Sequence, residues 1–195
     1  DTHEARLERV REGVSQLRSR GVDLRDHLDH WTSHDAAQEH HLTSDGAVVS
    51  RERGSLDPRT WRWLRDERTG ARERVDALLG RSAGKPLAPT TLVGASPPCT
   101  LLELLGRTDD GPHAYSPWVA LIEPDPVELL DALAWPNAER RSRDERVLVF
   151  SGPDAVARFE TWARDRFEAQ AIGEVIVSPT LTAPAIPDPR TLVER

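Results

Sequence analysis

Small and acidic residues follow three short apolar segments in the second half of the chain, and their types suit the binding of a ligand. Gly94, Ala95 and Ser96 follow the first segment, Glu123 ends the second, and Asp154 follows the third. Small side chains let backbone N–H groups approach an anion, and a carboxylate accepts hydrogen bonds from a ribose diol or an amino group. The pattern predicts a nucleotide-type ligand, with Glu123 on the ribose and Asp154 on an adenine amino group.

The elements that would position these residues alternate between strands and helices. The predicted strands cover residues 91–93, 118–122, 147–150 and 174–177, and helices follow the first three at residues 101–105, 127–134 and 156–167. Continuous apolar strands between amphipathic helices are typical of a parallel sheet covered on both faces. We therefore predict an α/β fold for residues 90–180, a Rossmann-like three-layer and mostly parallel sheet. Ligands of such sheets bind outside the carboxyl ends of the strands.

The N-terminal part of the chain predicts a helical extension over residues 1–80. Apolar residues recur at helical spacing over residues 2–19, and a second helix is predicted to begin near Asp23. Ala47 to Val49 could form a short strand. Asp57 and Pro58 begin a third helix, since Asp is a good N-cap and Pro suits the first turn, and Gly80 stands where this helix would end. Residues 81–89 are expected to form a linker, and residues 181–195 an extended tail.

The order of the candidate ligand residues resembles the first half of a class I methyltransferase that depends on S-adenosylmethionine (SAM). In that family a glycine-rich loop follows the first strand, an acid ends the second strand, and another acid follows the third. The matching positions are Gly94–Ser96, Glu123 and Asp154, with Ser178–Thr180 where the fourth strand meets the reaction centre. The resemblance implies SAM as the cofactor of a transferase.

Two stretches also resemble the motility-associated-factor glycosyltransferases. They read VALIEPDPVELLDAL at residues 119–133 and DERVLVFSGPDAVARFETW at residues 144–162. In that family EPDP and GPDA close two strands, and a helical region bearing DP precedes the first strand, as residues 57–58 do here. The resemblance covers residues 57–180 and implies a nucleotide sugar as ligand. Pro97 and Pro98 stand where both families favour glycine and lack the N–H groups of a phosphate cradle, so we expect a degenerate domain.

A helix over residues 23–41 would gather histidines on one face. At about 100° per residue, the side chains of Asp23, His27, His30, His34 and His41 fall within a sector of about 60°. Imidazoles at this spacing could bind Zn²⁺ or a similar ion, so His27, His30 and His34 predict a metal site. The alternatives are a packing surface that responds to pH and an exposed polar stripe that binds nothing.

The composition narrows the class of protein. A net charge of −7 argues against a protein built to bind nucleic acid, whose phosphates attract a basic surface. No apolar run approaches the roughly 20 residues of a membrane span. The chain has one cysteine, Cys99, and cannot form an internal disulfide, so we expect the reducing cytoplasm. Lys85 is the only lysine beside many arginines, and the chain is rich in Ala, Asp and Pro. This composition indicates a GC-rich bacterial genome.

Three functions follow from these patterns. The first is a ligand-binding domain of transferase type, specific for SAM or a nucleotide sugar, methyltransferase-like or glycosyltransferase-like if it is active. The second is a non-catalytic module whose N-terminal helices bind a protein partner or a second copy of the chain. The third is a metal-binding protein that uses the histidine cluster.

Overall fold

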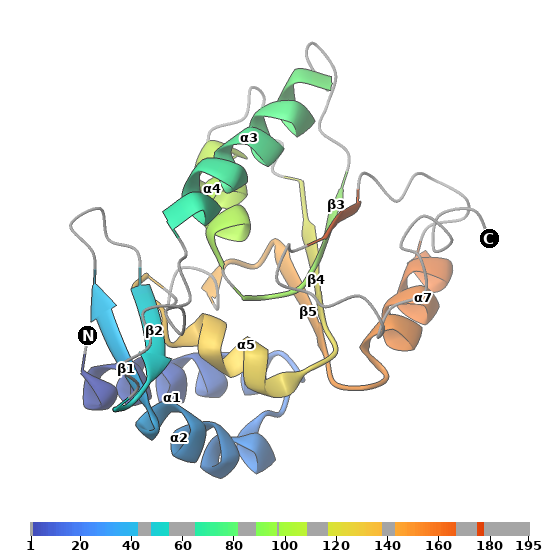
Figure 1. Ribbon diagram of the computed structural model, residues 1–195. Helices are drawn as coiled ribbons and strands as arrows, with labels where there is room; N and C mark the ends of the chain where they lie inside the picture. The colour runs from blue at the N-terminus through green and yellow to red at the C-terminus, as the bar shows by residue number, and fades with distance from the viewer. Residues whose placement is uncertain are drawn as a thin grey trace.

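A four-stranded parallel sheet with helices on both sides lies at the centre of the protein (Figure 1). The computed structural model describes residues 2–42, 48–54, 65–81, 89–96, 98–108, 117–137, 143–166 and 175–177. The fold is α/β, as the alternation of apolar strands and amphipathic helices predicts.

The strands of this sheet are all parallel. They are β3 (Thr90–Val93), β4 (Val119–Glu123), β5 (Val147–Ser151) and β6 (Val175–Val177), in the spatial order β5-β4-β3-β6. In the register of the sheet Leu92 lies opposite Leu121 on one side and Ile176 on the other. The predicted strands and their parallel pairing are confirmed. Because parallel strands end at the same edge, the loops after β3, β4 and β5 lie side by side.

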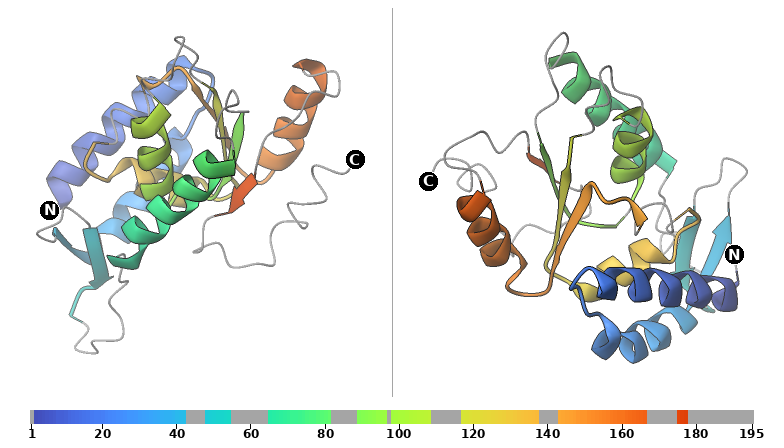
Figure 2. Two further views of the ribbon diagram at one scale, coloured as in Figure 1. Left: turned by 90° about the horizontal axis from the view of Figure 1, so that it is seen from above. Right: turned by 180° about the vertical axis from the view of Figure 1, so that it is seen from behind.

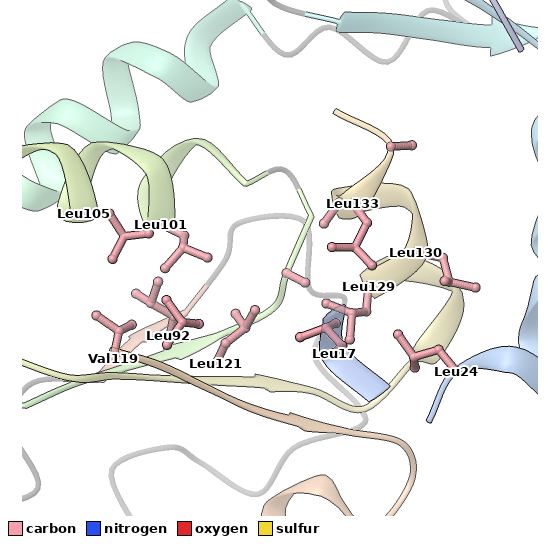
Figure 3. Close-up of a cluster of buried hydrophobic side chains, with 14 of the residues drawn as sticks. Leu17, Leu24, Leu92, Leu101, Leu105, Val119, Leu121, Leu129, Leu130 and Leu133 are labelled. Carbon is pink, nitrogen blue, oxygen red and sulfur yellow. The ribbon is translucent and has the colours of Figure 1, made fainter. Parts of the chain in front are cut away.

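Helices cover both faces of the sheet because alternate side chains of a strand point to opposite faces. The covering helices are α4 (Cys99–Thr108), α5 (Pro126–Leu133) and α7 (Ala155–Arg166). Leu121 of β4 shares a buried cluster with Leu105 of α4 (Figure 3). Its neighbours Ala120 and Ile122 pack on the opposite face against Phe159 of α7. Figure 2 accordingly shows α7 on one side of the sheet and α4 on the other.

The N-terminal helices extend the cluster under α4 and α5. They are α1 (His3–Ser19), the 3₁₀-helix η1 (Arg25–His27) and α2 (Leu28–Ala36). Thr2 caps α1 by accepting a hydrogen bond from the Ala5 N–H, and Leu17 of α1 is buried beside α5 (Figure 3). A Cβ at Gly13 would lie 2.9 Å from Leu133 Cδ2, so the glycine permits the close approach of α1 to α5. The predicted helix over residues 2–19 is confirmed.

Helix α3 (Arg65–Arg81) packs against α4 and buries Ala71, Val75 and Leu78. These side chains recur at helical spacing. The prediction that Gly80 ends the helix is wrong, because the helix continues through Gly80 to Arg81. The predicted helix start at Asp57 and Pro58, residues 82–88 of the predicted linker and the tail at residues 181–195 lie outside the described residues.

An antiparallel hairpin follows α2. The prediction was one continuous helix over residues 23–41, with the histidines on one of its faces. The strands of the hairpin are β1 (Gln38–Leu42) and β2 (Val48–Glu52), and His40 lies opposite Ser50. The hydroxyls of Thr32 and Ser33 bond back to carbonyl oxygens one turn earlier, so these residues do not end the helix. The helix ends at Ala36, and the following residues satisfy their backbone groups by pairing with β2. The continuous helix is therefore wrong, whereas the predicted strand near Val48 is confirmed.

Candidate functional site

The loops after β3, β4 and β5 meet at the carboxyl edge of the sheet. The Gly94 N–H donates to the Ile122 carbonyl oxygen at 2.9 Å, and the Gly152 N–H donates to the Glu123 carbonyl oxygen at 3.0 Å. Both glycines adopt positive φ, 96° and 102°, a conformation that side-chain-bearing residues rarely take. These turns keep the backbones of the three loops side by side at this edge.

The Glu123 side chain joins two of these loops. Its Oε2 accepts a hydrogen bond from the Ala95 N–H at 2.6 Å, and its Oε1 accepts one from the Asp125 N–H at 2.9 Å. Glu123 is only 3% exposed. The small-residue loop and the acid predicted to hold one ligand are thus in direct contact. The Ala95 N–H, which we expected to face a ligand, donates to a carboxylate of the protein itself.

Burial of the Glu123 carboxyl changes its acidity. Loss of solvent raises the pKa of Glu123 from 4.5 to about 7, against the opposing effect of the hydrogen bonds from Ala95 and Asp125. Nearby Glu128 and Asp125 add a smaller increase. Both protonation states are therefore populated near neutral pH. A carboxyl perturbed in this way at a strand end is typical of ligand and catalytic sites, although buried structural acids show it too.

The other predicted ligand residues differ in their accessibility. Ser96 is half-buried in the loop after Ala95. The Asp154 side chain is 66% exposed, and its Oδ1 lies 3.3 Å from Arg158 Nε one turn further along α7. Asp154 therefore faces solvent two residues beyond Gly152, within reach of a ligand at this edge. Residues 178–180, predicted to approach the reaction centre, lie outside the described residues.

The space beside the ends of β3 and β6 is small. A cavity of about 10 Å³ is bounded by Val93, Gly94, Ala95, Thr100 and Ile176, among others. One water molecule requires about this volume. The cavity that these described residues bound is therefore too small for a nucleotide, which would lie over its outer surface or enter after the loops separate.

The predicted metal residues do not form the expected stripe. His27 ends η1, whereas His30 and His34 are exposed on α2 and His41 lies on β1. Across the described part of the chain, no group of three or more His, Cys, Asp or Glu side chains is placed to hold a metal ion. The end of α2 at Ala36 takes His41 off the helix, and His27 lies in the 3₁₀-helix before α2, whose spacing differs from that of an α-helix.

A buried cluster of ionic side chains surrounds Asp35 of α2, and it was not predicted from the sequence. Arg6 and Asp35 are each 1% exposed, and Arg6 Nε donates to Asp35 Oδ1 at 2.8 Å. His3 Nδ1 lies 2.6 Å from Asp35 Oδ2, and His40 Nε2 lies 2.9 Å from Asp35 Oδ1. Arg6 Nη2 also donates to Asp131 of α5 at 2.7 Å. The cluster therefore ties α1, α2, β1 and α5 together.

One signal in the sequence could have revealed this cluster. Arg6 is four residues before Val10, on the apolar face of α1 that also carries Val14 and Leu17. An arginine at such a position is expected to be buried, and a buried guanidinium requires a carboxylate partner. The identity of that partner could not be read from the sequence, because Asp35 is 29 residues away.

The surroundings of Asp35 hold it in the charged form. Burial alone would raise its pKa, but the close contact of the His40 ring, the charge of Arg6 and the bonds from His3 and Arg6 together lower it well below the usual range. The stabilising contribution of this carboxylate is present above the ordinary aspartate pKa of about 4 and is lost as the pH falls below it.

No family model, curated protein or solved structure matches this chain. None of the helices in the described segments combines the length and the apolar character needed to span a bilayer. The chemistry of the sites described above is therefore the basis of any assignment of function.

Proposed function

We propose that the four-stranded sheet belongs to a Rossmann-like domain that binds a nucleotide-type ligand, SAM or a nucleotide sugar, at its carboxyl edge. In this proposal Glu123 accepts hydrogen bonds from the ribose hydroxyls, and Asp154 accepts one from an amino group of the base. Transferase activity is what the resemblance of the sequence implies. The proposal depends above all on the contact of the Glu123 carboxylate with the Ala95 N–H, which brings the small-residue loop and the acid together.

The order of the strands supports this assignment. The chain passes from β3 to β4 to β5 and then returns to the far side of β3 as β6. The strand order therefore reverses beside β3, and ligands of open α/β sheets bind outside the strand ends at such a reversal. Gly94, Ala95 and Ser96 follow β3 at this point.

The chemistry of Glu123 fits a ribose diol. An ionised carboxylate offers about four lone-pair directions, and the bonds from Ala95 and Asp125 use one on each oxygen. Two acceptor sites therefore remain for hydroxyl groups. Because Glu123 is 3% exposed, the loops after β3 and β4 must separate before a diol can reach it. The exposed Asp154 requires no such movement.

Thermal unfolding with SAM, its demethylated product and UDP-glucose tests the proposal. A ligand at about 100 times its Kd stabilises the native state by about 2.7 kcal/mol, which raises Tm by roughly 5–10 °C for a chain of this size. We expect Glu123→Gln to abolish the ligand-induced shift, because an amide cannot accept both hydroxyls and both N–H groups. Asp154→Asn, at a largely exposed position, should weaken the shift without changing the Tm of the free protein.

Glu160→Gln is the matched control, since Glu160 is exposed on α7 away from this edge. It should leave the ligand-induced shift intact. A panel in which no ligand raises the Tm of the unmodified chain contradicts the proposal. So does a shift that survives in both Glu123→Gln and Asp154→Asn.

A non-catalytic interaction module is the second candidate, and the closed carboxyl edge favours it. Both Glu123 oxygens are bonded to backbone N–H groups, and the adjoining cavity measures about 10 Å³. In an interaction module, Glu123 would hold the loops after β3 and β4 together through these hydrogen bonds. The N-terminal helices would bind a protein partner or a second copy of the chain. This candidate predicts no ligand-induced shift, together with self-association or a stable complex in light scattering.

A further inference from the structure

A second hollow lies between α3, the beginning of α4 and the segment after α5. Its volume is about 150 Å³. A cavity of this volume in another protein binds benzene, so a six-membered ring fits the space. Contacts between α3 and α4 preform its walls, because Arg74 donates to Thr100 Oγ1 at 3.1 Å and Arg107 pairs with Asp76.

Part of the wall of this hollow is apolar, and polar side chains form the rest. Ala71 of α3, Cys99 of α4 and Trp135 form a small buried cluster and are 1%, 7% and 4% exposed. Half-buried Leu102 and Pro136 add to this apolar part, and Asn137 also lines the hollow. An indole beside aliphatic groups favours a flat apolar body, since aromatic rings pack in stacked or edge-on arrangements.

The rim of the hollow carries excess positive charge. Arg68 and Arg72 lie one turn apart on the side of α3 that lines the hollow, and Glu103 lies across from them. The Glu103 carboxylate forms ion pairs with two arginines, at 4.0 Å from Arg72 Nε and 3.7 Å from Arg107 Nη1. The Asp76 carboxylate forms an ion pair with Arg107. Within the segments that the structure describes, Arg68 has no acidic partner, so its guanidinium can receive an anion.

We propose that this hollow binds a small anion with a flat apolar body, such as an aromatic carboxylate. The ring lies against Trp135 and Leu102, and the carboxylate accepts hydrogen bonds from Arg68 at the rim. Guanidinium groups pair with carboxylates through two parallel hydrogen bonds, which fixes the orientation of the anion. Glu123 does not line this hollow, and the proposal does not depend on the function proposed at the carboxyl edge.

Calorimetric titration of the whole chain with benzoate tests this site. Benzamide has the same ring without the charge, and acetate has the charge without the ring. We expect benzoate to bind at millimolar concentrations and at least tenfold more tightly than either analogue. Arg68→Gln should weaken benzoate binding by at least about tenfold, since the loss of even one charge-assisted hydrogen bond has this effect.

Two further variants locate the bound anion. Arg164→Gln removes an exposed charge on α7 and should leave benzoate binding unchanged. Leu102→Trp fills the hollow without changing its charge and should abolish binding in a folded protein, as judged from its Tm; if that variant does not fold, Arg68→Gln alone decides. Absence of benzoate binding, equal binding of benzamide or unchanged binding to Arg68→Gln overturns the proposal.

Discussion

Replacing Asp35 by asparagine is expected to lower the free energy of unfolding by about 3–5 kcal/mol. Asparagine keeps the shape of the side chain but removes its charge, and Arg6 remains charged at 1% exposure. Arg6 would keep its ion pair with Asp131. The Asp131 side chain is 33% exposed, so water screens this ion pair more strongly. Thermal or urea unfolding measures the change, which corresponds to a fall in Tm of roughly 10 °C.

Two variants control this measurement. Asp165→Asn changes an exposed aspartate of α7 and should alter stability by less than about 0.5 kcal/mol. Arg6→Met combined with Asp35→Leu replaces the buried pair by apolar groups and should recover much of the loss. A cost below about 1 kcal/mol for Asp35→Asn would show that the cluster does not hold the N-terminal helices to α5.

Stability should also depend on pH through Glu123. Its pKa is raised by burial to about 7 from 4.5, so the folded protein binds more protons than the unfolded chain between these values. The protonated form therefore contributes stability that is fully present below about pH 4.5 and is lost as the pH rises through 7. The shift corresponds to a decrease of up to about 3 kcal/mol across this window.

Urea unfolding at about pH 5 and about pH 8 measures this dependence. Histidines titrate in the same range, so the informative quantity is the difference between the unmodified chain and Glu123→Gln. We expect the stability of the unmodified chain to fall more steeply with rising pH than that of Glu123→Gln. Glu160→Gln, which removes an exposed carboxylate, should retain the steep dependence. Equal slopes for the unmodified chain and Glu123→Gln would contradict burial of an ionisable Glu123.

The parallel sheet could be predicted because its signal is local. The strands β3, β4 and β5 are short apolar runs, each followed by a turn and an amphipathic helix. Parallel strands end at one edge, so the alternation of strands and helices was enough to place the residues after β3 and β4 at the same edge. The closure of that edge could not be predicted, because it depends on which backbone N–H groups the carboxylate finds within 3 Å.

The N-terminal half was harder to predict because its structure depends on distant contacts. The strand β1 has the sequence QEHHL, which lacks apolar alternation and gives no strand signal. The strand forms through pairing with β2 and through the contact of His40 with Asp35. Arg6 likewise bonds to Asp131, which is 125 residues away. No short window of sequence contains the bond between Arg6 and Asp131.

Amide NMR spectra of the chain, recorded during titration with SAM and with UDP-glucose, test the proposed ligand site most directly. If the carboxyl edge binds a nucleotide-type ligand, the amide signals of Ala95 and Asp125 will show the largest shifts, because their N–H groups bond to the carboxylate that receives the ribose. The Asp154 signal should shift with them. Signals at these positions that stay unchanged at millimolar ligand, or shifts confined to another face, would contradict a nucleotide site at this edge.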